Sequence, residues 1–176
     1  MRPTSEPRIG FVASAGDGDA LPAMTRALAP PATRGRGPEV EIVAMDRADA
    51  GAVAAFLEAH PTVHFRDWEA PLVADAVTRP PAACFIARRT DGRIGGAVIA
   101  GSFGVRGTIS HIAVAEDLRR RGIATALARH ALDALRRNGI LRVFLFTLDE
   151  SPEARVFWRS LGFHPTEGET TLEADL

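Results

Sequence analysis

The sequence contains no lysine and no tyrosine, and both absences narrow the chemistry open to the protein. All 21 basic residues are arginines, so any single arginine partly reflects composition. The net charge is only −1. General binders of nucleic acid or of anionic membranes usually carry a clear basic excess, so the charge argues against both classes.

Cysteine and long apolar runs are also scarce. Cys84 is the only cysteine and cannot form an internal disulfide. It lies in an apolar run, so we expect a buried core thiol in a reducing cytoplasm, not a nucleophile. No stretch approaches the roughly 18 apolar residues of a membrane span, and no charged start with a long apolar stretch opens the chain. The sequence therefore predicts a soluble, cytoplasmic protein without a membrane partner.

The five histidines are scattered and do not suggest a metal site. His60 and His64 are four residues apart, but Pro61 prevents them from sharing a helical face. We therefore expect no metal ion.

At 176 residues the chain has the size of one domain with a substantial core. Half of the twelve prolines lie in residues 1–38, which predicts an irregular N-terminal extension. A short strand (Arg8 to Ala13) and a helix (Ala20 to Leu28) could form there and pack on the main domain or on a second subunit. The folded domain is expected over residues 39–176.

Apolar periodicity predicts alternating strands and helices in that domain. The turn Asp91-Gly92 suits a hairpin, and the strands on either side of the third helix should be parallel through a crossover. Strands are expected at 40–44, 83–89, 94–103, 108–115, 140–148, 163–166 and 170–175, and helices at 46–59, around 70–78, from 123 to about 138, and from 152.

The turn Arg119-Arg120-Arg121-Gly122-Ile123-Ala124 has the features of a pyrophosphate site. It lies where a strand ends and a helix begins, and a helix N-terminus presents unpaired N–H groups and partial positive charge. Gly122 has no Cβ to keep a phosphate from the backbone. The arginines add forked donors suited to phosphate oxygens. The alternative is a solvated arginine run that flanks a helix.

This turn resembles motif A of the Gcn5-related N-acetyltransferases (GNAT): Gln or Arg, two residues, Gly, one residue, then Gly or Ala. Arg119, Gly122 and Ala124 match that pattern. At the required separation, residues 140–163 are similar to the family's motif B, a strand followed by Asn-x-x-Ala, a helix with Phe-Tyr, and Leu-Gly-Phe. The chain reads Ser-Pro-Glu-Ala at 151–154, Phe-Trp at 157–158 and Leu-Gly-Phe at 161–163.

The resemblance covers residues 39–176 and implies the GNAT fold, an α/β (α+β) architecture. Its mixed central sheet has about six to seven strands. Splayed parallel strands flank the motif A helix, and helices lie on both faces. Local signals agree, since Ser151 suits an N-cap, Pro152 the first helical position, and Gly162 a left-handed helix end.

The resemblance also implies that acetyl-CoA is the cosubstrate. Its pantetheine arm would pair with the backbone of Ile112, Ala113 and Val114. Its pyrophosphate would bind the backbone amides of the motif A turn. The side chains of Arg120 and Arg121 would either contact the phosphates or face solvent. The full expected cofactor set is Ile112, Ala113, Val114, Arg119, Arg120, Arg121, Gly122, Ile123, Ala124, Thr125, Ser151 and Trp158.

The implied reaction is direct attack of a primary amine on the thioester in a ternary complex, without an acyl-enzyme. An amine with a pKa near ~10.4 is neutral only about once in a few thousand molecules at pH 7. A base, or a water path to one, is therefore needed. The family often places Glu or His nine or eleven residues before motif A, but this chain has Ser110 and Thr108 there.

His111 is the nearest titratable group and the candidate catalytic residue. Strand alternation points it away from the face of Thr108, Ser110 and Ile112, unless a β-bulge re-aims it. The alternatives are His64, Asp67 and Glu69, in the loop expected to rim the acceptor site. Asp67 and Glu69 would also favour a cationic amine as the acceptor. The short turn at 165–169 suggests that the acceptor side is open.

The acid that protonates the departing thiolate is missing as well. The family's tyrosine is replaced by Trp158, whose indole N–H donates a hydrogen bond but is no acid. The proton would come from water or from Ser151, or would not be needed. Trp158 either packs beside the thioester or fills the core.

The sequence thus predicts an N-acetyltransferase acting on an amine of a small molecule or peptide. Neither motif determines which acyl chain is bound, so transfer of an acyl group other than acetyl is an alternative. The missing tyrosine and strand carboxylate leave open a non-catalytic CoA-binding sensor or partner module. A nucleic-acid contact through residues 119–121 would be salt-sensitive, and the balanced charge argues against it. A homodimer would be common for the family, but no interface can be predicted.

Overall fold

The computed structural model describes residues 40–147 and 151–166, apart from the side chain of Asp67. The chain divides into two units, residues 1–35 and 36–176, and all described residues belong to the second. The strand and helix expected within residues 1–38, and the terminal strand expected at 170–175, lie outside the described residues.

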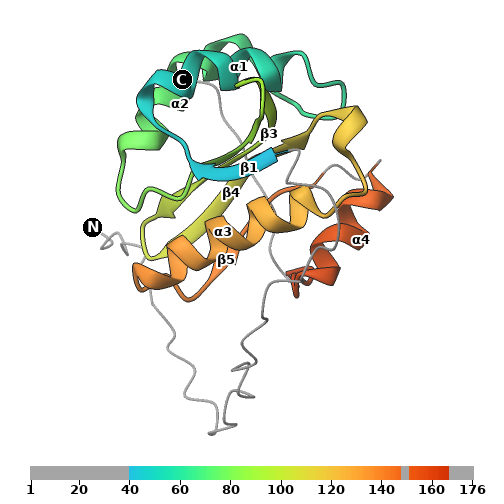
Figure 1. The fold of residues 1–176 in the computed structure, drawn as a ribbon. Helices are drawn as coiled ribbons and strands as arrows, with labels where there is room; N and C mark the ends of the chain where they lie inside the picture. Colours follow the sequence, from blue (N-terminus) through green and yellow to red (C-terminus); the bar gives the residue numbers. More distant parts are fainter. Residues whose placement is uncertain (1–39, 148–150, 167–176) are drawn as a thin grey trace, which may run out of the picture. The chain divides into compact units, whose positions relative to one another are not determined.

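The described residues form a five-stranded mixed sheet in the order β1-β2-β3-β4-β5 (Figure 1). The first four strands are antiparallel neighbours, and β5 is parallel to β4. Residues 163–166 form no strand. The strands are β1 (Val40–Ala44), β2 (Phe85–Arg89), β3 (Ile94–Phe103), β4 (Arg106–Val114) and β5 (Val143–Phe144).

Helices cover both faces of the sheet, as predicted. Figure 1 shows α1 and α2 on one face and α3 on the other. The helices are α1 (Ala50–Glu58), α2 (Ala70–Thr78), α3 (Ile123–Arg137) and α4 (Pro152–Ser160).

Asp46 begins the first helical segment, as its N-cap type predicts. Its carboxylate accepts the N–H groups of Ala48 (2.7 Å) and Asp49 (3.2 Å), and the Asp49 carboxylate accepts the Asp46 N–H (3.2 Å). This reciprocal capping box satisfies N–H groups that a helix start leaves unpaired. The first turn, Arg47–Asp49, is a 3₁₀ helix that continues into α1.

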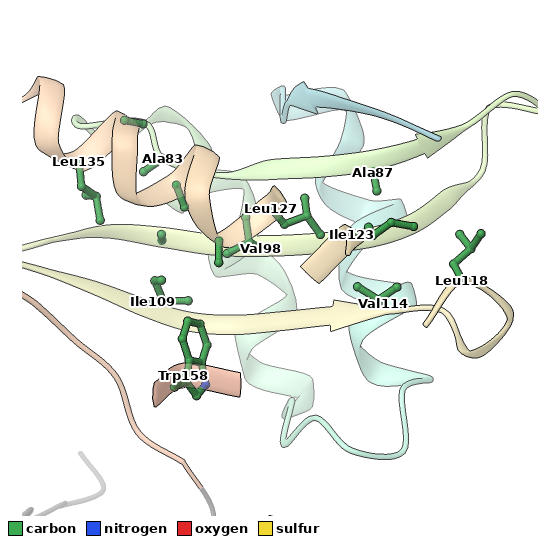
Figure 2. Packing of buried hydrophobic residues seen from close by; sticks show 14 residues of the cluster. Ala83, Ala87, Val98, Ile109, Val114, Leu118, Ile123, Leu127, Leu135 and Trp158 are labelled. Atoms are coloured by element: carbon green, nitrogen blue, oxygen red, sulfur yellow. The ribbon is translucent and has the colours of Figure 1, made fainter. Parts of the chain in front are cut away.

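The larger core lies between α3 and the sheet (Figure 2). Leu127 and Leu135 of α3 are fully buried in the same core as Val98 of β3. Trp158 of α4 is 7% exposed and belongs to the same core, near Ile109 of β4 (Figure 2). Each such large apolar side chain stabilises the fold by roughly 1.5–3 kcal/mol when it leaves water. This packing fixes α3, and therefore its N-terminus, against the sheet.

A second core lies on the face of α1 and α2, and it contains Cys84. The Cys84 thiol donates a hydrogen bond to the Ala100 carbonyl, with Sγ 3.4 Å from the oxygen. Burial raises the pKa of this thiol. The predicted burial of Cys84 in the core is therefore confirmed. A raised pKa also makes a thiol a poorer nucleophile near neutral pH.

The strand expected at 140–148 is much shorter in the structure. Gly139 has φ +80°, and the Ile140 N–H donates to the Leu135 carbonyl (3.1 Å), so these residues end α3 instead of starting a strand. Strand β5 pairs with β4 only at Gly107↔Val143 and Thr108↔Phe144. The parallel strands then separate, and no described strand pairs with β4 beyond Thr108 on that side.

A β-bulge interrupts β4 at Ser110. Ile99 pairs with His111 and Ala100 pairs with Ile109, so Ser110 is an extra residue opposite β3. A single extra residue shifts the alternation of all later side chains by one position.

The turn between β4 and α3 is tied to β2 by an ion pair. The Arg89 guanidinium donates two hydrogen bonds to the Asp117 carboxylate, at 2.7 and 2.6 Å. These bonds, and to a lesser extent the charges of Arg89 and Arg121, hold the pKa of Asp117 below its ordinary value. A depressed pKa means that the stabilisation is present above the unfolded carboxyl pKa of about 3.9 and is lost as the pH falls through the folded pKa.

We therefore expect Asp117→Asn to lower the melting temperature at pH 7 but to lose this effect as the pH falls well below the unfolded carboxyl pKa of about 3.9. Thermal unfolding of the wild type and the variant between pH 2.5 and 7 measures the difference. Asp133→Asn is the control, because Asp133 makes only a single 3.3 Å contact with Arg136 on the helix surface. If both variants differ from the wild type by the same amount at every pH, the Arg89 pair does not hold the turn.

Candidate functional site

The C-terminal half of β4 has one edge free of any described strand. The Ala115 N–H donates to the Gly95 carbonyl of the β3 side (2.9 Å). Backbone groups alternate in direction along a strand, so Ala113 also faces β3, while the N–H and C=O groups of Ile112 and Val114 face the opposite edge. Of the three residues expected to pair with pantetheine, two therefore present their backbone to this edge.

Two side chains hold the Val114 carbonyl at that edge. The His60 Nε2 lies 3.1 Å from the Val114 oxygen, and Arg119 Nε donates to the same oxygen at 3.4 Å. The Arg119 Nη2 also lies 3.3 Å from His60 Nε2, and His60 Nδ1 lies 3.2 Å from the Thr62 hydroxyl oxygen. Sequence reasoning considered His60 only as a metal ligand and missed this contact, which spans 54 residues.

The turn after β4 is held on two sides. Leu118 packs over Gly95: a Cβ at position 95 would lie 2.6 Å from Leu118 Cδ1, so any larger residue would displace the Leu118 side chain. The Arg89–Asp117 pair fixes the neighbouring residue. The turn then enters α3 through two left-handed residues, Arg120 (φ +61°) and Gly122 (φ +79°).

A helix start without a side-chain cap and without acidic residues favours an anion, and α3 begins in this way. Gly122 is the N-cap and supplies no side-chain cap, and the first turn contains no acidic residue. The first N–H groups of the helix are thus left for another acceptor. Arg119, Arg120 and Arg121 are exposed around it. No described atom lies within 4 Å of the position that a Gly122 Cβ would take, so this space is open.

Glycine is needed at position 122 for a reason that the sequence did not reveal. The prediction concerned the missing Cβ, whereas the structure adds a backbone conformation that other residues rarely adopt. Ile123 is buried, and Ala124 and Thr125 are half-buried at the first turn. The structure thus brings residues 119–125 together at one end of the open β4 edge.

The motif B residues have a mainly structural setting. Ser151 is the N-cap of α4 by position, but its side chain makes no capping hydrogen bond. Trp158 packs edge-on against Phe157 and Phe163, with ring centroids 4.8 and 5.2 Å apart. The burial of Trp158 supports the core role that the sequence left open, and its contact with a cofactor stays a prediction.

The bulge at Ser110 re-aims His111. Thr108 and Ser110 line a cavity together with residues of α2, and His111 contacts the loop that leads into α2. His111 therefore lies on the same face as Thr108 and Ser110, and simple strand alternation is wrong on this point. The reason is the extra residue Ser110, after which the side chain of His111 points to the same face as that of Ser110.

His111 is held by groups from the α1–α2 connection. Its Nε2 lies 3.5 Å from Glu69 Oε1 and 3.3 Å from the His64 carbonyl oxygen. The Phe65 ring packs edge-on against the imidazole at 5.3 Å. Both polar neighbours of Nε2 accept hydrogen bonds, so Nε2 carries the proton and Nδ1 is left as the basic nitrogen.

Of the three loop alternatives to His111, the structure describes the side chains of His64 and Glu69, whereas that of Asp67 lies outside the described residues. Glu69 is half-buried, and its Oε2 accepts the Arg66 N–H at 2.7 Å while Oε1 faces His111. The side chain of His64 is not part of this contact, which uses its carbonyl. Glu69 and His111 therefore contact each other in the structure.

The described residues contain neither a candidate metal cluster nor a helix suited to span a membrane. Their histidine, cysteine and acidic side chains form no group of three or more that could hold a metal ion. Within the same residues, no helix combines the length and the apolar character of a membrane span.

Comparison with solved structures gives the same fold. Ard1 from Thermoplasma volcanium superposes with a TM-score of 0.63 at 22% identity, over 73% of this chain and 84% of that one. The ribosomal-protein-S18-alanine N-acetyltransferase of Escherichia coli gives 0.61 at 22%, over 72% and 79%. The diaminobutyrate acetyltransferase EctA of Paenibacillus lautus, in complex with L-2,4-diaminobutyric acid and coenzyme A, gives 0.61 at 19%, over 71% and 75%.

The sequence itself identifies the family. No protein of curated function matches the chain. The sequence model of the acetyltransferase (GNAT) family, however, matches residues 45–163, a range that runs from the end of β1 through both motifs. The mixed sheet, the separated parallel strands and the glycine-led start of α3 are the elements that this match spans. The chain therefore belongs to the acetyltransferase (GNAT) family.

Proposed function

We propose that the protein is an acetyl-CoA-dependent N-acetyltransferase that transfers the acetyl group to a primary amine by direct attack in a ternary complex. The observation that carries this proposal is the continuity of the open β4 edge with the start of α3. The edge offers the backbone groups of Ile112 and the N–H of Val114, whose carbonyl His60 and Arg119 already hold. The helix start offers N–H groups and exposed arginines. A pantetheine arm that ends in a pyrophosphate fits this sequence of donors and acceptors.

The relatives support the same reaction class. The name of the Escherichia coli relative gives the alanine of a ribosomal protein as its acceptor, and the Paenibacillus relative was solved with the amine that it acetylates. Acetyl transfer to an amine is therefore the first activity to test.

In the proposed reaction the amine nitrogen attacks the thioester carbonyl carbon. The C–N bond forms, the C–S bond breaks, and CoA leaves as a thiolate that takes a proton from water. The amine loses one proton, which passes to Nδ1 of His111 directly or through water. Glu69 is a positioning residue, because its carboxylate fixes the Nε2–H tautomer and stabilises the imidazolium that forms.

The activity test uses the purified full chain with acetyl-CoA, a panel of primary amines and a thiol reagent. We expect thiol release that depends on the amine, with little background because Cys84 is buried. Longer acyl-CoAs in place of acetyl-CoA test transfer of another acyl group. Thermal stabilisation by CoA with no turnover over a broad panel would contradict the proposal and favour a CoA-binding sensor.

The cofactor site is tested by Gly122→Val, which forces a branched side chain into a left-handed conformation and into the open anion site. We expect calorimetry to show loss of CoA binding, with the circular dichroism spectrum preserved. The matched control is Gly139→Val, at φ +80° on the other end of the same helix, also in open space. Unchanged CoA affinity in Gly122→Val, or equal loss in both variants, would contradict the proposed pyrophosphate site.

The proton acceptor is tested by His111→Gln. Loss of general-base catalysis typically costs about 10²–10⁴-fold, so we expect kcat to fall by that order while CoA affinity is kept. The kcat of Glu69→Gln should lie between the kcat of His111→Gln and that of the wild type. The control is His130→Gln, on the exposed surface of α3. A kcat for His111→Gln within twofold of the wild type would rule out a catalytic role.

A further inference from the structure

A cavity of about 130 Å³ lies beside the β4 bulge, between the sheet and the end of α2. Its walls include Ala76 and Arg79 from the end of α2, Ile99 and Ser102 from β3, and Thr108 and Ser110 from β4. Pockets that enclose a drug-sized ligand usually measure about 300–1,000 Å³, so this cavity suits one small group and not a whole large molecule.

Arg79 is the charged residue in the cavity wall, and its guanidinium has no hydrogen bond or ion pair with any described side chain. The serine hydroxyls are already used as donors, Ser110 to the Ile99 carbonyl (3.3 Å) and Ser102 to the Pro80 carbonyl (3.5 Å). Within the described part of the chain, the Thr108 hydroxyl has no such partner. Among the described residues, the cavity wall therefore combines one cation with a free hydroxyl donor and contains no carboxylate.

The cavity lies on the reacting side of β4. Ser110 and His111 are adjacent and face the same side because of the bulge. Ile112, the first residue of the open edge, follows two positions after Ser110, or about 7 Å along an extended strand. A group bound in the cavity would therefore lie within a few bond lengths of an amine at His111.

We propose that the acceptor amine also carries a carboxylate, and that Arg79 and Thr108 bind that carboxylate in this cavity. This inference rests on the proposed function. A guanidinium presents a planar fork of N–H groups that matches the two oxygens of a carboxylate, and a hydroxyl can donate a further hydrogen bond. The sequence had suggested a cationic acceptor through Asp67 and Glu69. The Glu69 carboxylate is occupied by the Arg66 N–H and His111, and the side chain of Asp67 lies outside the described residues.

The test compares matched acceptors that differ only in this group. Alanine and alaninamide, and 4-aminobutyrate and propylamine, are assayed with acetyl-CoA by the wild type, Arg79→Gln, Arg79→Glu and Thr108→Val. We expect the wild type to prefer each carboxylate by at least tenfold in kcat/KM. Arg79→Gln should bring the ratio toward one, mainly by raising KM for the carboxylate, and Arg79→Glu should reverse it. Thr108→Val should lower the ratio less. Arg137→Gln, an exposed arginine at the end of α3, is the control.

The outcomes separate this inference from the proposed function. If amines are acetylated but carboxylates and their neutral partners react equally, the carboxylate site is wrong while the transferase stands. The same conclusion follows if Arg79→Gln lowers kcat/KM by the same factor for the carboxylate and for its neutral partner. If no amine is acetylated and CoA does not bind, the proposed function itself fails.

Discussion

The site depends on the point where β4 and β5 stop pairing. After Thr108↔Phe144 no described strand continues the ladder on that side, and the backbone groups of Ile112 and Val114 are left at an edge. Unpaired backbone polar groups in a folded protein need a partner, whether protein, water or ligand. Here the Val114 carbonyl is held by His60 and Arg119, two side chains that meet at the place proposed for the pantetheine arm. The early end of β5 therefore leaves this edge without a strand neighbour among the described residues, and we propose that an extended ligand takes that place.

The bulge at Ser110 gives the same strand a second role. It turns His111 toward the face of α1 and α2, where Glu69 and the Arg79 cavity lie. The donor is thus proposed to run along the strand edge to the start of α3, and the acceptor to enter from the face. In this proposal β4 brings the two substrates together, because its pairing with β5 ends early and because Ser110 is an extra residue in it. The rest of the fold holds this strand, with Leu127 and Leu135 packing α3 behind it.

Local signals in the sequence predicted the regular elements well. The expected bounds of β1 and β3 are those of the structure, the helix expected around residues 70–78 is α2, and Asp46 caps the first helical segment as its residue type indicates. The motif A glycine was also found, because glycine at a helix start leaves a clear pattern. Features set by distant partners were missed. The length of β5, the bulge, and the contact of His60 with Val114 depend on which segments meet in space, and no single stretch of sequence carries that information.

The central claim is that CoA binds along the open β4 edge and at the start of α3. Hydrogen exchange of the backbone amides, resolved by residue with and without saturating CoA, tests it most directly. The claim predicts slower exchange at Ile112 and Val114 and at residues 123–125 of the first α3 turn, with Ala97 in the middle of β3 as an unchanged reference. Unaltered exchange at Ile112 and Val114, with protection appearing elsewhere, would contradict it.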